Sequence, residues 1–176
     1  MTQIANAYAQ GLYQLAKDEG LTEELLQQLI TLQSAFAEEP SFCRLLSTAN
    51  LSKDERVSIL DSSFRDKVHP YVLNFLKILT ERGYIAHFSD CCVAFRNQYN
   101  EDNDILPVSA VTAVPMTEQQ QAKLTQKLTS LTGKTVDLAN RVDPHCLGGV
   151  RLDYDGKRVD GTVKNRLDGL AKLLRG

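Results

Sequence analysis

Two histidine–cysteine pairs come closest to a chemical function in this chain. His87 and Cys91 are four residues apart, which places them on one face of a helix, and His145 and Cys146 are adjacent. Imidazole and thiolate groups bind zinc, and a thiolate activated by an imidazole is a nucleophile. Zinc sites normally take four ligands, however, and the chain has neither a CxxC nor an HExxH pattern. The pairs favour core thiols and surface imidazoles, and a small enzyme using Cys146 and His145 is kept as a rival hypothesis.

The other chemically suggestive residues have structural explanations. Gly148 and Gly149 precede a predicted strand, whereas a phosphate-binding loop places its glycines between a strand and a helix. Acidic pairs at 23–24 and 38–39 lie at predicted helix ends and are typical of solvated charges. The four cysteines show no disulfide framework, so reduced and mostly buried thiols are expected. We predict no catalytic site, cofactor, metal ion or small-molecule substrate.

Charge is distributed unevenly along the 176 residues. Residues 1–104 carry 9 Lys/Arg against 15 Asp/Glu, and residues 105–176 carry 11 against 7. Opposite signs favour two domains with different partners. A nucleic-acid-binding adaptor is a second rival, but the basic half has no dense Lys/Arg run and its one aromatic residue is Tyr154. We therefore predict no nucleic-acid partner. No apolar run of 18 residues is present, and the first residues lack a signal-peptide pattern, which favours a cytoplasmic location.

Residues 1–104 show helical signals only. Gly20 and Gly83 are natural helix stops, and Thr22 is a candidate N-cap. Ser52 opens a capping box, and Pro70 suits a first helical turn. The expected helices are 3–19, 22–38, 42–47, 52–62, 70–83 and 85–100. Their short connections favour a helical bundle.

The pattern changes after residues 100–104, whose acidic and polar character indicates a hinge. Alternating segments at 105–113, 134–142 and 150–154 predict strands, and Asp155-Gly156 predicts a hairpin with a return strand at 158–159. Helices are expected at 117–133 and 162–174. The predicted fold is therefore two-domain and mainly α, with a helical bundle over 1–104 and a small α/β (α+β) domain over 105–176.

Two of the expected helices have more apolar surface than one core-facing stripe needs. The helix at 70–83 is apolar nearly all round, and the helix at 3–19 carries two neighbouring stripes. The second stripe contains Ile4, Tyr8, Gly11 and Leu15, and the small side chains of Ala7 and Gly11 would allow close approach of another helix. One interpretation is a central core helix with a packing seam. The other is a groove that accepts an amphipathic helix from another chain.

The motifs that appear in order along the chain resemble those of the delta subunit of bacterial F-type ATP synthase, whose family includes the plastid delta subunit and the mitochondrial oligomycin-sensitivity-conferring protein. The resemblance covers essentially the whole length. It rests on Tyr8-Ala9 with Leu12-Tyr13 and Ala16, on Asn74-Phe75-Leu76, on residues 105–116, and on Val142-Asp143-Pro144, Leu147-Gly148-Gly149-Val150, Asp160-Gly161-Thr162-Val163 and Arg166-Leu167. Tyr84 stands where the family usually has arginine, and Cys146 where it often has an aliphatic residue.

The resemblance implies a six-helix N-terminal bundle, a smaller α/β domain and a non-catalytic role. In this family the subunit belongs to the peripheral stalk, which links the catalytic head to membrane-anchored b subunits and resists rotation during proton-driven ATP synthesis. The bundle binds the N-terminal helix of an α subunit between its first and fifth helices, and the C-terminal domain contacts the C-termini of the b subunits. The implied location is the cytoplasmic side of the bacterial inner membrane, reached only through the complex.

These implications assign roles to particular residues. The groove for the α-subunit helix is predicted to be lined by Tyr8, Gly11, Leu15, Asn74 and Ile78. A structural signature is expected at Asp143, Gly148, Gly149, Asp160, Gly161 and Arg166.

Overall fold

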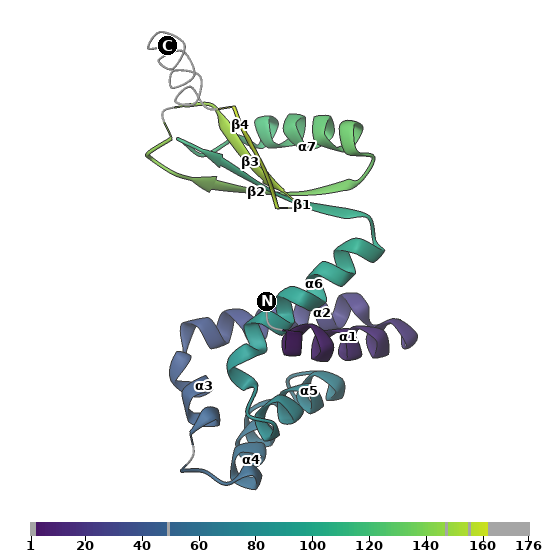
Figure 1. Ribbon diagram of the computed structural model, residues 1–176, viewed down its shortest axis with the longest axis vertical. Helices are drawn as coiled ribbons and strands as arrows, with labels where there is room; N and C mark the ends of the chain where they lie inside the picture. The colour runs from purple at the N-terminus through teal and green to yellow at the C-terminus, as the bar shows by residue number, and fades with distance from the viewer. Residues whose placement is uncertain (1–2, 49, 147, 155, 162–176) are drawn as a thin grey trace. The chain divides into compact units, whose positions relative to one another are not determined.

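The computed structural model of the chain describes residues 3–48, 50–146, 148–154 and 156–161. Its earlier part is helical (Figure 1), with α1 (Gln3–Asp18), α2 (Thr22–Glu38), α3 (Pro40–Ser47), α4 (Lys53–Phe64), α5 (Pro70–Glu81), the 3₁₀ helix η1 (Ile85–His87) and α6 (Phe88–Asp102). Its later part contains β1 (Ile105–Thr112), α7 (Glu118–Thr132), β2 (Thr135–Val142), β3 (Val150–Tyr154) and β4 (Lys157–Asp160). The protein is therefore mainly helical with a small four-stranded sheet.

The chain divides into two units, Met1–Tyr99 and Asn100–Gly176, so the division falls within the last turn of α6. Asp104, between α6 and β1, has a left-handed backbone with φ of 52°. Aspartate tolerates this conformation better than most residues because its short polar side chain can bond locally. The change from helix to strand therefore occurs at a residue suited to it.

Local sequence signals explain most helix boundaries. Gly20 has φ of 70°, and the amide of Leu21 donates to the Ala16 carbonyl at 2.7 Å, which closes α1 with a Schellman motif. Gly83 ends α5 in the same way, with φ of 75° and a 2.7 Å bond from the Tyr84 amide to Leu79. These closures confirm that both glycines terminate helices.

Capping boxes begin two helices. The Glu55 amide donates to the Ser52 hydroxyl at 3.2 Å, and the Ser52 amide donates back to the Glu55 carboxylate at 2.8 Å. These hydrogen bonds lower the pKa of Glu55 because they stabilise its ionised form. Thr117 and Gln120 form the equivalent reciprocal pair at the start of α7.

Two sequence-based boundaries are wrong. Thr22 is not an N-cap, because it is already helical and the residue at the cap position, Leu21, offers no side-chain acceptor. The single helix expected at 85–100 begins instead with the 3₁₀ turn of η1, after which α6 runs to Asp102. The helix expected at 162–174 lies outside the described residues.

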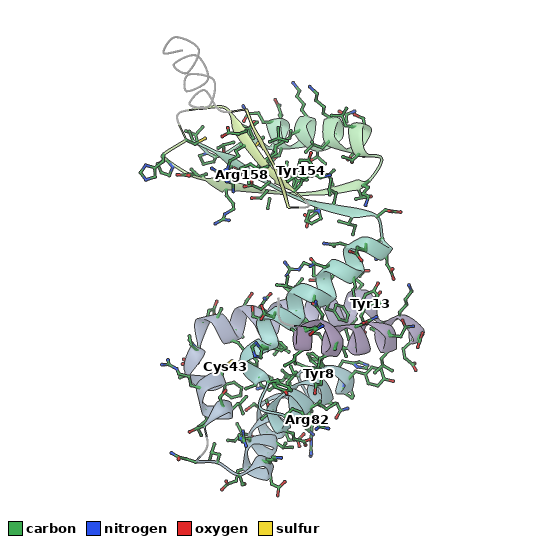
Figure 2. All side chains as sticks on the ribbon, in the orientation of Figure 1. Tyr8, Tyr13, Cys43, Arg82, Tyr154 and Arg158 are labelled. Carbon is green, nitrogen blue, oxygen red and sulfur yellow. The ribbon has the colours of Figure 1, made fainter. Side chains whose placement is uncertain are left out.

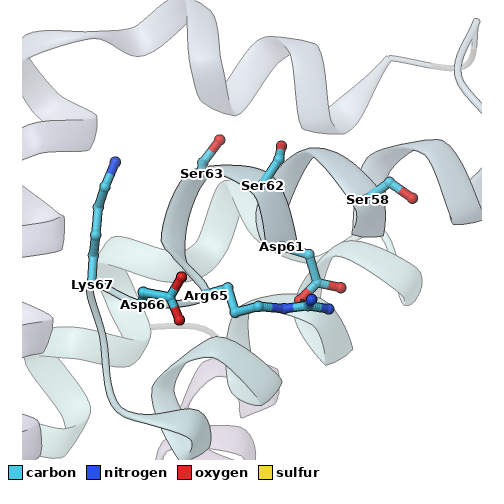
Figure 3. Close-up of a pocket in the computed structure, with 7 residues that line it drawn as sticks. All are labelled: Ser58, Asp61, Ser62, Ser63, Arg65, Asp66 and Lys67. Atoms are coloured by element: carbon cyan, nitrogen blue, oxygen red, sulfur yellow. Dashed lines mark ion pairs between the residues drawn. The ribbon is translucent and has the colours of Figure 1, made fainter.

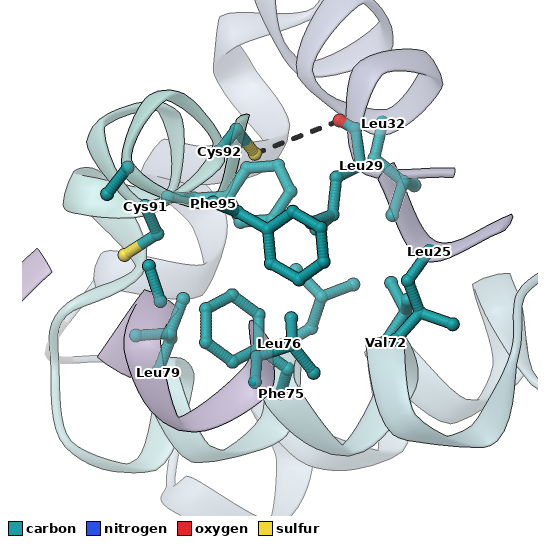
Figure 4. Packing of buried hydrophobic residues seen from close by; sticks show 14 of the residues in the cluster. Leu25, Leu29, Leu32, Val72, Phe75, Leu76, Leu79, Cys91, Cys92 and Phe95 are labelled. Atoms are coloured by element: carbon teal, nitrogen blue, oxygen red, sulfur yellow. Dashed lines mark hydrogen bonds between the residues drawn. The ribbon is translucent and has the colours of Figure 1, made fainter. Parts of the chain in front are cut away.

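The core of the helical unit is formed by facing stripes of α1, α2, α5 and α6 (Figure 4). Phe95 is fully buried and packs edge-on against Tyr13, with ring centroids 5.1 Å apart. The Cys92 thiol donates to the Leu29 carbonyl at 3.8 Å. Burial raises the pKa of Cys91 to about 11, with the negative charge of Asp90 adding to it, and burial and Cys91 raise the pKa of Cys92 to about 12. Both thiols are therefore protonated core side chains at neutral pH.

The sheet has strand order β2-β1-β3-β4. β1 and β2 are parallel and are joined through α7, whereas β3 is antiparallel to β1 and to β4. The Asn140 amide donates to the Ala110 carbonyl and the Thr112 hydroxyl, each at 2.9 Å, and its oxygen accepts the Met116 amide at 2.9 Å. This side chain ties the connection that leads into α7 to the centre of the sheet.

Candidate functional site

A groove between α1 and α5 is an apolar candidate site on the helical unit. It has a volume of about 270 Å³ and is lined by Ala7, Tyr8, Gly11, Leu12, Leu15, Tyr71, Asn74, Phe75 and Ile78. All five residues predicted to line it are present. The structure therefore brings together residues of α1 and α5 that are 59 to 70 positions apart in the sequence.

The groove arises because α1 and α5 each have more apolar surface than the core covers. On α1 the stripe of Ala5, Ala9, Leu12, Tyr13 and Ala16 is buried, whereas Ile4 and Leu15 remain 38% and 39% exposed. On α5 most apolar residues are buried, but Ile78 is 37% exposed. The α5 helix is therefore a core helix that also presents one apolar edge.

Gly11 keeps the groove open. A Cβ atom built at Gly11 would have no heavy-atom neighbour within 4 Å, so packing inside the protein does not require glycine here. Glycine within a helix costs roughly 0.5–1 kcal/mol relative to alanine. The absent side chain leaves the α1 backbone accessible to an approaching helix.

The groove walls are held by contacts at the helix ends. His69 caps α5, with its Nδ1 accepting the Tyr71 amide at 3.2 Å and its own amide donating to the Gln28 side chain at 2.6 Å. Tyr8 on α1 (Figure 2) lies beside Tyr84, with ring centroids 5.9 Å apart, so the start of α1 approaches the end of α5. Tyr84 thus supports the wall of the groove.

Sequence reasoning missed Leu12, Tyr71 and Phe75 as lining residues. Tyr71 is three residues before Asn74 and seven before Ile78, so the helical period places it on the same face of α5 and could have predicted it. Phe75 is 5% exposed and gave only a core signal. Phe75 lies at the groove floor because of the position of α1, and the periodicity of α5 alone does not predict that position.

Two other hollows lie on the helical unit, and one of them is polar. One, of about 420 Å³, lies among α2, α3, η1 and α6, and the Gln33 side chain donates across it to the Ser89 hydroxyl at 2.8 Å. The other, of about 460 Å³, is polar (Figure 3) and is lined by Ser58, Asp61, Ser62, Ser63, Arg65, Asp66 and Lys67. Its Asp61 carboxylate is paired with Lys77 at 2.6 Å. The mixed charges of this hollow do not select an anion or a cation.

The histidine–cysteine pairs do not form reactive sites. His87 Nδ1 lies 3.7 Å from the Asp90 carboxylate, and Cys91 is buried with a raised pKa. Cys146 is 9% exposed, and neighbouring His145 donates its amide to the Asp143 carboxylate. Across residues 3–48, 50–146, 148–154 and 156–161, no group of three or more His, Cys, Asp or Glu is placed to hold a metal ion.

Most of the signature residues shape the loops around β3. Asp143 donates its amide to the Thr112 carbonyl and accepts the Cys146 amide at 3.0 Å, which folds the turn after β2. Gly148 and Gly149 have φ of 109° and 85°, values that favour glycine. A Cβ at Gly161 would lie 3.2 Å from the Val150 carbonyl, to which the Gly161 amide donates. Asp160 ends β4 opposite Arg151, and Arg166 lies outside the described residues.

The sheet has one polar face. Strand alternation places Ser109, Arg141, Arg151, Asp153 and Arg158 on the side opposite Asn140. Arg158, which is labelled in Figure 2, donates to the Asp153 carboxylate at 2.7 Å, and Arg151 approaches the same carboxylate at 3.6 Å. The Arg158 hydrogen bond is the main cause of the lowered pKa of Asp153. This face of the sheet therefore presents charged side chains, whereas the α1/α5 groove presents apolar ones.

Comparisons with known proteins identify the family. The model of the ATP synthase delta (OSCP) subunit family matches residues 4–174. The chain is 34% identical to ATP synthase subunit delta of Alkaliphilus oremlandii (strain OhILAs), over 97% of each chain. It is 32% identical to ATP synthase subunit delta of Clostridioides difficile (strain 630), over 97% of this chain and 95% of the relative.

A solved structure of the Toxoplasma gondii mitochondrial ATP synthase hexamer contains a chain of the same fold, with a TM-score of 0.78, 20% identity and 99% of both chains covered. No helix among the residues placed by the structure is long and apolar enough to cross a membrane. The chain belongs to the ATP synthase delta (OSCP) subunit family, a non-catalytic, peripheral-stalk component of F-type ATP synthase.

Proposed function

We propose that the α1/α5 groove binds the N-terminal helix of an ATP synthase α subunit, and that Asn100–Gly176 contacts the C-terminal ends of the b subunits. Through these two contacts the chain would link the catalytic head to the membrane-anchored stalk and resist rotation of the head. The proposal assigns this work to the cytoplasmic side of a bacterial inner membrane. Membership of the delta (OSCP) family supports the role.

The apolar exposure at the groove is the observation that carries the first contact. Leu15 and Ile78 are each more than a third exposed, and Gly11 allows close approach of a guest backbone. An amphipathic helix laid into such a groove buries apolar surface worth roughly 25 cal/mol per Å², less the cost of ordering the partners. Helices α1 to α6 would act as one bundle that holds the two walls at a fixed spacing.

The second contact is proposed from charge. On one face of the sheet Asp137, Asp153 and Asp160 balance Arg141, Arg151 and Arg158, so the basic excess belongs to the unit as a whole: residues 105–176 carry 11 Lys/Arg against 7 Asp/Glu. Basic residues also continue in the sequence after the sheet, at Lys164, Arg166, Lys172 and Arg175, against one acidic residue, Asp168. Charges of this kind steer and orient partners of opposite sign. An acidic helical end of a b subunit is therefore the expected guest of this unit.

Titration calorimetry with a peptide of the α-subunit N-terminal segment tests the groove. Leu15→Asp should weaken binding by at least about 30-fold, because the groove would then bury a charge without a partner. Val93→Asp is the matched control, since Val93 is 37% exposed on α6 and does not line the groove. Equal affinities for Leu15→Asp and wild type would refute the placement.

A further inference from the structure

Asn74 is the residue that distinguishes the α1/α5 groove from a purely apolar cleft. It is exposed on α5 between Tyr71 and Ile78 and supplies the one carboxamide among the lining residues. Within the residues that the structure describes, its side chain makes no hydrogen bond or ion pair. The amide therefore keeps two donors and a carbonyl acceptor for a guest.

A guest helix that covers the groove removes the Asn74 amide from water. Apolar guest atoms over Asn74 would leave a desolvated amide without a partner, which lowers affinity by about 10-fold or more. A guest side chain able to exchange hydrogen bonds with the amide avoids this loss. A charged guest side chain is a poor substitute, because none of the lining residues is charged.

We infer that Asn74 is a specificity-determining residue: it selects a guest helix whose apolar seam is interrupted, opposite Asn74, by a single Ser, Thr, Asn or Gln. This inference rests on the proposed docking of the α-subunit helix. Leu15 and Ile78 supply the apolar contacts around the amide, and Gly11 permits close approach. One polar pair in an apolar seam also fixes the register of two helices, because every other register leaves both polar groups unpaired.

A double-mutant cycle on the full chain tests the inference. The probe is a synthetic peptide of the α-subunit N-terminal segment, and each of its Ser, Thr, Asn and Gln residues is replaced in turn by Leu. Asn74→Leu should weaken binding of the unaltered peptide about 10-fold, which is about 1.4 kcal/mol. One peptide substitution should weaken binding similarly in wild type and cause no further loss in the Asn74→Leu variant.

Matched controls separate specificity from folding. Asn97→Leu makes the same chemical change at an exposed position of α6 outside the groove and should leave every affinity unchanged. Asn74→Leu should retain the wild-type circular dichroism and unfolding midpoint, because leucine favours a helix more than asparagine does.

Additive effects for every peptide substitution, or unchanged binding by Asn74→Leu, would overturn the inference and leave the proposed groove intact. Failure of the unaltered peptide to bind wild type would instead reject the docking proposal on which the inference rests. The two failures are therefore distinguishable in one set of titrations.

Discussion

The groove of the helical unit and the polar face of the sheet differ in the physical chemistry that they offer a partner. The groove exposes Leu15 and Ile78, and none of its lining residues carries a formal charge. The sheet face carries Arg151, Asp153 and Arg158 in one ion-pair network. The chain therefore offers an apolar surface on one unit and a charged surface on the other. Variants and conditions that affect only one of them test this separation.

The largest expected effect concerns the core behind the groove. Phe95→Ala removes a fully buried ring that packs on Tyr13, and truncations of this kind cost about 3–5 kcal/mol of unfolding free energy. Hydrogen exchange read by mass spectrometry should show faster exchange in α1, α2, α5 and α6, with β1 to β3 unchanged. Equal acceleration in the sheet would show that the two units unfold together.

Filling the groove should come next in size. Gly11→Trp should weaken binding of the α-subunit peptide by about 100-fold, or about 2.7 kcal/mol, because the indole occupies the space of the guest. The unfolding midpoint should not fall, since nothing lies within 4 Å of the Gly11 Cβ position.

Gly11→Ala is the matched small substitution. It should raise the unfolding free energy by about 0.5–1 kcal/mol, because alanine is the better helix former. Chemical denaturation measures this gain. A destabilised Gly11→Ala would mean that the α1 backbone is more crowded than the structure shows.

The salt dependence of binding should differ between the two proposed contacts, with a smaller effect on affinity than the Gly11→Trp substitution. Raising the ionic strength from about 0.05 M to 0.5 M should change the groove affinity by no more than about 2-fold, since the lining lacks charge. Binding of a peptide from the C-terminal end of a b subunit to the full chain should weaken several-fold over the same range. Titrations of both peptides in parallel measure the contrast, and similar salt slopes would contradict it.

The smallest expected effect is an acid-dependent loss in the sheet. The pKa of Asp153 is lowered in the folded protein, so its contribution is present above the pKa of the unfolded state, near 4, and is lost as pH falls through the folded value. Asp153→Asn should therefore flatten the pH dependence of β3–β4 amide protection below about pH 4. An unchanged profile would mean that the Arg158 pair contributes no stability.

Periodicity predicted much of the helical unit because its signals are local. The second stripe of α1 contains Tyr8, Gly11 and Leu15, whereas their pairing with Asn74 and Ile78 came from the family resemblance; the structure places all five in one groove. The same patterns left open whether α5 is a core helix or a docking surface. That question depends on how much of each helix its neighbours cover, which is a property of tertiary packing.

Other features lie beyond local signals. The 3₁₀ turn at Ile85–His87 follows the closure of α5 at Gly83 and is held by the His87 amide, which donates to the Tyr84 carbonyl at 2.9 Å before α6 begins. Phe75 at the groove floor depends on the position of α1. On the sheet, alternation predicted the strands, but the Asp153–Arg158 pair depends on the register between β3 and β4.

Mapping the α-subunit peptide onto the isotope-labelled full chain by NMR chemical-shift perturbation is the most direct test of the groove. We predict that the largest shifts fall on amides of α1 and α5 around Gly11 and Asn74, with smaller shifts at Tyr84. Shifts concentrated around Gln33 and Ser89, or on the sheet, with α1 and α5 unperturbed, would contradict the account.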